Sequence, residues 1–497
     1  MLYSFLISKD ADFKPIGKVV NSNAAAPKAR RRARNAKASN VFTNEKTREE
    51  MKAREEEVRK NLKAITWKET EARGKFKKNE KIGLIDDGTL IVGCDVGSEK
   101  HFIRAIDSRG RELTKRAFSF CNNEEGLQSC LDRVVGLMAE NGKTRAVLGI
   151  EPTGHYWFDL ADWMVSHGIT VVQVNPYAVK QTKEIEDNSQ LKDDRKDPKP
   201  IANLVKDGNY GMPYRPDGNY AEMRNLSLLK DQLTEDSVRA VNRLHRLVKI
   251  YFPEYSQRLY KDIAAPFSIA VLKEAPLPCD IEGLGEEGVR KIWKAAGLKG
   301  AGHNKAAALV EAAGHSIGLT DGLESARVSM RLAAETVERI RADLAEVGGM
   351  LSEKCLEVEN AGNILEIGGI GETILCGILS ELGDISRFDS AKEIQKLSGL
   401  SLVSCSSGKH NGETRISKRG RKRLRYWLFM GAKSVVAHSD EFGRIHGYYT
   451  TRADNPLKRM QSLILIAGKL LRIIYAMLRK GSKYDPSMVG GPDDEAA

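Results

Sequence analysis

The run Thr89-Leu90-Ile91-Val92-Gly93-Cys94-Asp95 is apolar almost from end to end and finishes on an acid. Such a run is typical of a strand buried on both faces of a sheet, because both sets of alternating side chains must then be apolar. A second run of this kind, 145–150, is followed directly by Glu151. The two runs predict neighbouring buried strands, each ending in a carboxylate.

The segments around these two runs predict an α/β domain. The turn sequence at 107–110 separates two short extended segments, which indicates an antiparallel meander. Apolar residues at helical spacing follow from 123 onward. We expect strands at 89–95, 101–106, 112–120, 145–150 and 170–174, and helices at 123–140 and 158–167.

Two further acids follow the fifth expected strand, in Leu191-Lys192-Asp193-Asp194-Arg195-Lys196-Asp197-Pro198. On a helix, Asp194 and Asp197 would share a face, because residues three apart are neighbours. Two carboxylates this close repel each other unless a cation lies between them, and a divalent metal with oxygen ligands would serve. Pro198 disfavours helical geometry in the residue before it. Either a helix begins at Pro198, with Asp197 near its N-cap, or the pair is held in another way.

Acids at the ends of buried strands are costly unless they are paired or bind a ligand. In open sheets, ligands bind at strand ends. Four carboxylates can hold two divalent cations for in-line phosphoryl transfer, and the candidates are Asp95, Glu151, Asp194 and Asp197. The alternative is that these acids cap helices or pair with nearby cations. Their spacing alone leaves both open.

Composition narrows the class of protein. The chain has 497 residues, 41% hydrophobic and 29% charged, as in soluble proteins of about three domains. A net charge of +12 favours a polyanionic partner. Seven cysteines without a CxxC pair argue against a disulfide framework and a zinc site. No apolar run approaches a membrane span of roughly 20 residues, so we expect a cytoplasmic protein without a membrane partner.

The regions outside the α/β domain differ in character. Residues 1–86 begin with a basic block and a charged helical pattern, which predicts a disordered extension ahead of a domain at 87–215. Residues 216–360 are helical, and apolar residues recur every seven positions from Leu323 to Leu351. This heptad pattern predicts a coiled coil that makes the protein at least a dimer. The alternative is an amphipathic helix packed within its own domain. We expect a last ordered domain at 361–480 and a disordered tail at 481–497.

The last domain contains a candidate phosphate-contacting region. A glycine turn at 367–371 opens a helix at 372–382, as in helix-hairpin-helix segments, and such turns can hold a phosphate. A loop of small residues at 398–412 includes Ser406 and Ser407. A basic run then enters an apolar helix at 426–436, which favours contact with phosphates over a merely solvated face. Its candidate nucleic-acid-binding residues are Arg415, Lys418, Arg419, Arg421, Lys422 and Arg423.

The chain resembles a known family in the order and content of its motifs. The motifs are IVGCDVGSEKH, LGIEPTGHYW, VVQVNPYAVKQTKE, LKDDRKDPKPIANLVKDGNY and, further on, ILEIGGIGETILCGILSELGDISRFDSAKEIQKLSGLS and SSGKHNGETRISKRGRKRLR. Together they are similar to the DEDD transposases of bacterial insertion sequences, relatives of the pilin-gene invertase. The resemblance covers roughly residues 89–450. The chain departs from it in a longer N-terminal extension and in Pro198, where alanine is common.

This resemblance implies a fold, an activity and site residues. It implies a RuvC-like (RNase H-like) domain with catalytic, metal-binding acids at Asp95, Glu151, Asp194 and Asp197, served by Mg²⁺, with two ions expected. It implies a serine nucleophile directly before a glycine, which is Ser407, with Ser406 as the close alternative. It also implies DNA partners, namely the ends of the element and its target, and in some members a structured non-coding guide RNA.

We therefore predict an insertion-sequence transposase that cleaves and exchanges DNA strands in the bacterial nucleoid. One alternative on the same fold is a Holliday-junction-type nuclease or a site-specific DNA invertase. Another is a non-catalytic nucleic-acid-binding assembly protein that depends on the heptad region.

Overall fold

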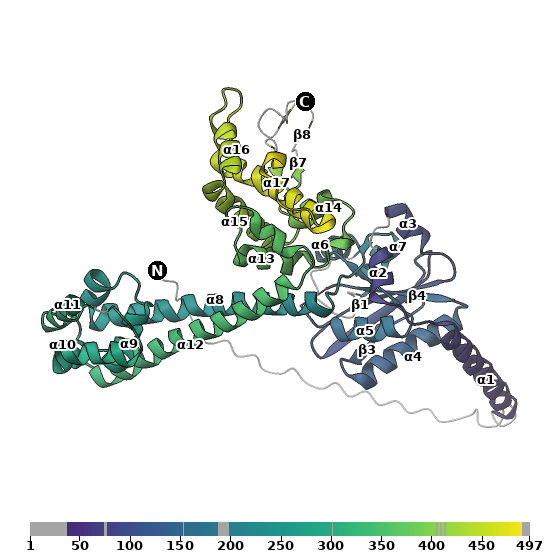
Figure 1. Ribbon diagram of the computed structural model, residues 1–497. Helices are drawn as coiled ribbons and strands as arrows, with labels where there is room; N and C mark the ends of the chain where they lie inside the picture. The colour runs from purple at the N-terminus through teal and green to yellow at the C-terminus, as the bar shows by residue number, and fades with distance from the viewer. Residues whose placement is uncertain are drawn as a thin grey trace, which may run out of the picture. The chain divides into compact units, whose positions relative to one another are not determined.

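The computed structural model describes residues 37–73, 77–152, 154–186, 198–300, 302–403, 406–407, 410–411 and 414–489. The chain divides into two compact units, residues 1–214 and 215–497, which we call the first and second units. We describe each by itself (Figure 1).

The first unit is built on one mixed sheet. Its strands are β1 (Thr89–Asp95), β2 (Lys100–Ile106), β3 (Phe118–Cys121), β4 (Arg145–Ile150), β5 (Thr170–Val174) and β6 (Tyr210–Gly211). They lie in the order β3-β2-β1-β4-β5-β6. β1 pairs parallel with β4, which pairs parallel with β5, whereas β2 and β3 form an antiparallel meander beside β1. The predicted mixed α/β architecture and its buried central strands are confirmed; β6 was not expected.

Helices cover both faces of this sheet. The helices of the first unit are α1 (Lys37–Asn61), α2 (Trp67–Arg73), α3 (Lys78–Gly83), α4 (Glu124–Glu140), α5 (Phe158–Ser166), α6 (Pro176–Glu186) and α7 (Pro198–Lys206). Leu90, Val92 and Cys94 pack with α4 and α5 on one face. Ile91 packs with α7 on the other.

Helix α7 lies directly on the two central strands. Gly93 of β1 is the register partner of Gly149 of β4. A Cβ atom on Gly93 would lie 1.9 Å from the carbonyl oxygen of Pro198, and one on Gly149 would lie 2.4 Å from Val205 Cγ2. Real Cβ atoms do not come this close, so glycine at both positions is what allows α7 to dock. The docking brings the first residue of α7 against β1, two residues before Asp95.

Part of the segment expected to be a disordered extension forms helices. Three partly buried residues, Val58, Leu62 and Ile65, pack against the core beneath α4 and α5. Arg59 pairs with Asp132 at 2.6 Å, and the backbone N–H of Ile65 donates to the carbonyl oxygen of Val165. Val58 lies on α1, and Leu62 and Ile65 lie in the connection to α2, so a few apolar contacts at the end of α1 and just after it hold this segment on the domain.

The second unit is mostly helical, with a long antiparallel arm. Its helices are α8 (Gly218–Tyr251), α9 (Pro266–Glu274), α10 (Pro278–Ala295), α11 (His303–Gly314), α12 (Leu323–Leu356), α13 (Glu372–Leu382), α14 (Ala391–Ser398), α15 (Lys422–His438), α16 (Asp440–Thr451) and α17 (Arg459–Lys480). Helices α8 and α12 lie side by side, and α9, α10 and α11 form a cap at the outer end of this arm (Figure 1).

The heptad residues of α12 are buried within their own chain. Met330, Val337 and Ile340 belong to a core shared with α8 and the cap helices, and Leu351 belongs to the core of the C-terminal helices. The helix predicted from the heptads is present, and its apolar seam packs against α8 of the same chain. A coiled coil between copies remains a prediction.

Helix α17 has the length and apolar composition of a membrane span, contrary to the expectation that no segment approaches one. However, its residues Ile466, Leu470 and Ile474 are fully buried in the core with α13 and α15. It is the central helix of the C-terminal core, and no membrane protein is indicated. The expected tail at 481–497 is ordered as far as Val489, which is buried in the same core.

Substitution of Gly93 by alanine should displace α7. The added methyl group meets backbone rather than a flexible side chain, so we expect the free energy of unfolding to fall by about 2–3 kcal/mol. Gly211→Ala, in strand β6 of the same sheet, is the matched control because its Cβ position has no neighbour within 4 Å. Equal denaturation midpoints for the two variants would contradict the proposed docking constraint.

Candidate active site

Two predicted acids lie side by side at one edge of the sheet. Asp95 is the last residue of β1, and Glu151 directly follows β4. Cys94 and Ile150, the residues before them, are register partners in parallel strands, and neighbouring strands lie about 4.8 Å apart. Both acids are partly buried. Side chains two apart on a strand share a face, so Asp95 lies on the face of Gly93, where α7 packs.

The other two predicted acids, Asp194 and Asp197, lie outside the described residues. Their described neighbour Pro198 is the first residue of α7 and is buried against Gly93. Lys199 Nζ contacts Glu112 Oε1 at 2.8 Å, and this contact ties the start of α7 to the meander. The hydrogen bond from Lys199 lowers the pKa of Glu112 and keeps that carboxyl ionised. Helix α7 is described from Pro198 onward, and the choice between the two sequence alternatives for Asp197 stays a prediction.

The turn after Asp95 is held by a buried histidine. His101 of β2 is fully buried, and its ring lies 5.1 Å from that of Phe120. The backbone N–H of Gly97 donates to His101 Nδ1 at 3.3 Å. Burial lowers the pKa of His101, and only a neutral imidazole has a nitrogen that can accept. His101 is thus a positioning residue for the turn, which the sequence interpretation missed although His101 closes the motif around Asp95.

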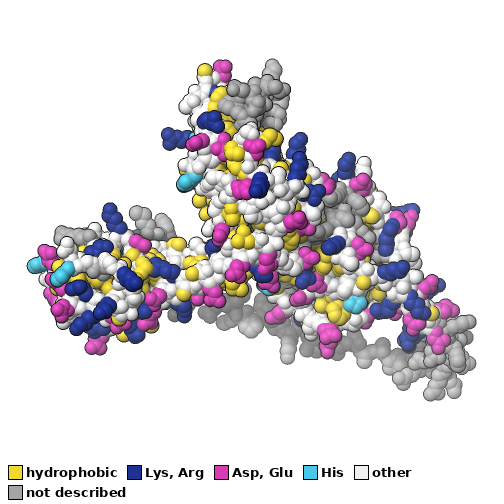
Figure 2. Space-filling view, in the orientation of Figure 1, with side chains coloured by type: hydrophobic (Ala, Val, Ile, Leu, Met, Phe, Trp, Pro, Cys, Tyr) yellow, Lys and Arg dark blue, Asp and Glu magenta, His cyan; other side chains and the backbone are white. Residues whose placement is uncertain are grey.

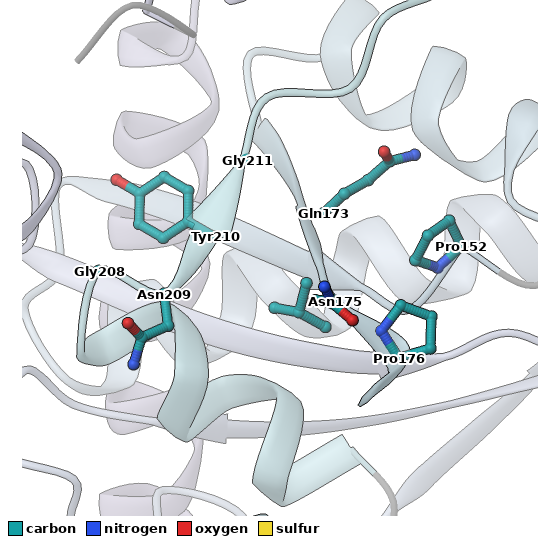
Figure 3. A pocket seen from close by; sticks show the side chains of 9 residues that line it. Pro152, Gln173, Asn175, Pro176, Gly208, Asn209, Tyr210 and Gly211 are labelled. Atoms are coloured by element: carbon teal, nitrogen blue, oxygen red, sulfur yellow. The ribbon is translucent and has the colours of Figure 1, made fainter. Parts of the chain in front are cut away.

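An open cavity of about 490 Å³ lies beside this edge of the sheet. It is lined by Pro152, Gln173, Val174, Asn175, Pro176 and residues 208–211. Figure 3 shows Pro152 and Pro176 on one side and Asn209 and Tyr210 on the other. Pro152 directly follows Glu151, so the cavity adjoins the paired acids.

The donor set at this edge suits a divalent cation. Asp95 and Glu151 place two carboxylates at neighbouring strand ends, and carboxylate oxygens are the preferred ligands of hard cations. Within the described residues no group of three or more His, Cys, Asp or Glu side chains could hold a metal. The two described acids would thus need the carboxylates just before α7 to complete such a site.

The candidate serines lie on a hairpin of the second unit. β8 (Ser406–Ser407) pairs antiparallel with β9 (His410–Asn411), so that Ser407 is the register partner of His410. Before and after it, β7 (Leu402–Val403) pairs with β10 (Arg415–Ile416). The segment predicted as a small-residue loop is therefore two short ladders. The side chains of residues 404–413 lie outside the described set.

The base of this hairpin is tightly packed. The N–H of Lys418 donates to the carbonyl oxygen of Gly399, and the N–H of Arg421 donates to that of Leu397. A Cβ on Gly420 would lie 2.3 Å from the Leu397 oxygen, and Gly420 has a φ of +152°. The hairpin thus leaves the end of α14 and returns to it at a fixed point.

The basic run after the hairpin divides into two sets. Arg421 donates to the carbonyl oxygen of Glu381. Arg423 contacts Glu381 Oε1 at 3.4 Å and Asp231 Oδ2 at 2.8 Å. Glu381 is 1% exposed and also pairs with Arg224 at 2.7 Å, so Arg421 and Arg423 fix the start of α15. Arg415, Lys418, Arg419 and Lys422 are exposed.

Comparison with known proteins gives consistent matches. A family profile described as "Transposase" matches residues 92–253, and one described as "Transposase IS116/IS110/IS902 family" matches residues 361–449. The chain is 24% identical over 404 residues to an uncharacterized 44.8 kDa protein of insertion element IS116 from Streptomyces clavuligerus, covering 80% of this chain and 96% of that protein.

Two other relatives match less of the chain or at lower identity. An uncharacterized 42 kDa protein of insertion element IS900 from Mycobacterium paratuberculosis is 22% identical, covering 80% of this chain and 97% of that protein. A pilin gene-inverting protein from Moraxella bovis is 34% identical over 129 residues, which is 25% of this chain and 38% of that protein.

Protonation of His101 should loosen the first unit. Because its pKa is lower in the folded chain than the usual 6.5, the folded state loses stability as the pH falls below about 6.5. We expect the melting temperature of wild-type protein to fall between pH 7.5 and 5.5 more steeply than that of His101→Asn. Parallel pH profiles for the two proteins would show that His101 does not titrate with folding.

Proposed function

The chain belongs to the IS116/IS110/IS902 family of transposases, and we propose that it cleaves and exchanges DNA strands with four carboxylates and a serine. The observation that carries this proposal is the placement of Asp95 and Glu151 at adjacent ends of parallel strands, beneath the start of α7. The residue before α7 is Asp197, and Asp194 lies three positions earlier. We propose that Asp197, which is bonded directly to Pro198, supplies a third acid to the described pair.

The order of the six strands supports an RNase H-like, RuvC-like first unit. Parallel β1, β4 and β5 beside an antiparallel meander are what the family resemblance implies. Divalent cations bound by the acids, which we propose to be Mg²⁺, would supply charge neutralisation at the scissile phosphate and acidify the attacking hydroxyl. The acids themselves would hold and orient that centre, and the neutral His101 would keep the turn after Asp95 in place.

The strand exchange we propose conserves phosphodiester bonds. The hydroxyl oxygen of Ser407 attacks phosphorus, the bond from phosphorus to the leaving strand oxygen breaks, and the serine proton passes to a base. Attack by a hydroxyl of the incoming strand then reverses the step and frees the serine, so that no external energy source is needed. Exposed cations beside the hairpin, Arg415, Lys418 and Arg419, would stabilise charge on the phosphate.

Two partners remain part of the proposal. DNA is the partner that transposases and recombinases act on. A guide RNA is implied only by the family resemblance, and the positive charge of the chain suits either nucleic acid. An assembly of copies would let the acids of one copy meet the serine of another. Since the heptad seam is packed within the chain, such an assembly would use other surfaces of the arm.

Removal of an acid should abolish cleavage. We expect Asp197→Ala to reduce strand cleavage of element-end DNA with Mg²⁺ by at least 100-fold, because the metal centre loses a ligand. Asp193→Ala removes an equal charge four positions before Asp197 and should retain near-wild-type activity. Near-normal cleavage by Asp197→Ala would exclude the four-acid site.

Removal of the nucleophile should abolish the covalent adduct. We expect wild-type protein to form a denaturant-resistant DNA adduct that Ser407→Ala fails to form and Ser406→Ala retains. Loss of the adduct in Ser406→Ala alone would move the nucleophile by one residue. Full cleavage by Ser407→Ala without any adduct would instead favour a junction-type nuclease that uses the acids alone.

A further inference from the structure

The helical cap at the outer end of the arm carries a patch of cations. Arg290, Lys291 and Lys294 lie on the exposed face of α10. The opposite face packs Val289 and the fully buried Trp293 into the arm core, and Trp293 Nε1 donates to the carbonyl oxygen of Phe267. The exposed face of α10 is thus held in one orientation by the buried face.

Two more exposed cations, Lys299 and Lys305, follow in the turn to α11 and in its first turn. The sequence from 290 to 305 contains no Asp or Glu. We call the five cations, Arg290, Lys291, Lys294, Lys299 and Lys305, the cap patch. Figure 2 shows Lys and Arg side chains over this end of the arm, with Asp and Glu side chains among them.

Among the residues that the structure describes, the cations of the cap patch lie in no ion pair, unlike several of their neighbours. On the arm nearby, Lys273 pairs with Glu338 at 2.6 Å and Arg327 with Asp280 at 2.8 Å. Within the described residues, no ion pair joins any member of the cap patch to an acid. Like charges four apart on a helix, as at Arg290 and Lys294, repel each other. An external anion would relieve that repulsion.

The patch surrounds a concave surface. A cavity of about 390 Å³ is lined by Glu287, Arg290, Lys291, Trp293, Lys294, Leu298 and Gly300. Glu287 is the one acid among them. The neighbouring Glu286 is engaged by His303, whose Nδ1 lies 2.9 Å from its Oε2. The cavity is therefore walled mainly by cations, with three basic side chains against one acidic one.

The turn from α10 to α11 leaves its backbone accessible. Gly297 and Gly300 have φ of +70° and +87°, and no heavy atom lies within 4 Å of a Cβ placed on either of them or on Gly302. Helix α11 begins at His303 and has no acid in its first turn. A phosphate can thus approach both the cations and the N–H groups at the start of this helix.

We propose that the cap patch binds the phosphodiester backbone of a nucleic acid, at a site separate from the acids and the serine. It lies at 290–305, between the stretches matched by the two family profiles. The proposal depends on the proposed function in one respect only, namely that the partner is a nucleic acid. The contact is independent of sequence, because the patch offers charge and backbone donors rather than groups that read base edges.

The test is equilibrium binding of full-length protein in EDTA, which separates this contact from metal-dependent cleavage. The probes are a random-sequence 30-base-pair DNA duplex and an RNA hairpin of equal length. The test variant is Arg290→Gln/Lys291→Gln/Lys294→Gln. We expect its affinity to fall roughly tenfold near 0.15 M salt, and the slope of log affinity against log salt to fall by about 2–3.

The matched control is Arg243→Gln/Arg246→Gln/Lys249→Gln, which removes the same charge from exposed residues of α8. Circular dichroism and melting temperature establish that both triple variants are folded. A loss of affinity larger than that of the control supports the proposal. Whether the loss occurs with DNA, with RNA or with both shows which nucleic acid the patch binds. An unchanged salt slope in the test variant, or an equal loss of affinity in the control, overturns the proposal. The cleavage variants of the acids and the serine test the proposed function separately.

Discussion

The close approach of α7 to β1 and β4 is the constraint on which the first unit depends. Two glycines at one register position, Gly93 and Gly149, form a flat surface with no room for a side chain. Helix α7 rests on it, with Pro198 buried at one end and Val205 at the other. Two residues beyond each glycine comes an acid. The same backbone geometry that admits the helix therefore brings Asp95 and Glu151 to the edge where the helix begins.

In the second unit, a buried ion network holds the helices around the serine hairpin. Glu381 is nearly inaccessible and is shared by Arg224 of α8 and Arg423 of α15. Removing one partner of such a network leaves a buried charge, at a cost of about 3–5 kcal/mol. Burial raises the pKa of Asp231, while Arg423 opposes that shift. The start of α15 is fixed in this way, and with it the point to which the hairpin returns.

The sequence was most informative where one physical signal dominated. Buried strands at 89–95 and 145–150, and helices such as 372–382, follow from apolar runs and helical spacing, and the structure has them at nearly the predicted bounds. The docking of α1 and the segment after it was not foreseen, because their few apolar residues, Val58, Leu62 and Ile65, are surrounded by charges. The pattern Gly-x-acid occurs at both strand ends and was available in the sequence. Its meaning lies in the contact with α7, which no single segment reveals. Likewise, the Arg423 side chain points into the protein because it contacts Glu381, a residue forty-two positions earlier in the chain.

The glycine surface also sets an order of events during synthesis. Strands β1 and β4 leave the ribosome before α7 does, and the surface exists only once they have paired. Helix α7 therefore cannot dock before β1 and β4 have paired, and strand β6 follows α7 in the chain, so the helix and the sheet are completed together as one domain. A nascent chain that ends before residue 206 holds β1 and β4 but lacks part of α7 and all of β6, so the glycine surface stays uncovered until the rest of the domain has been made.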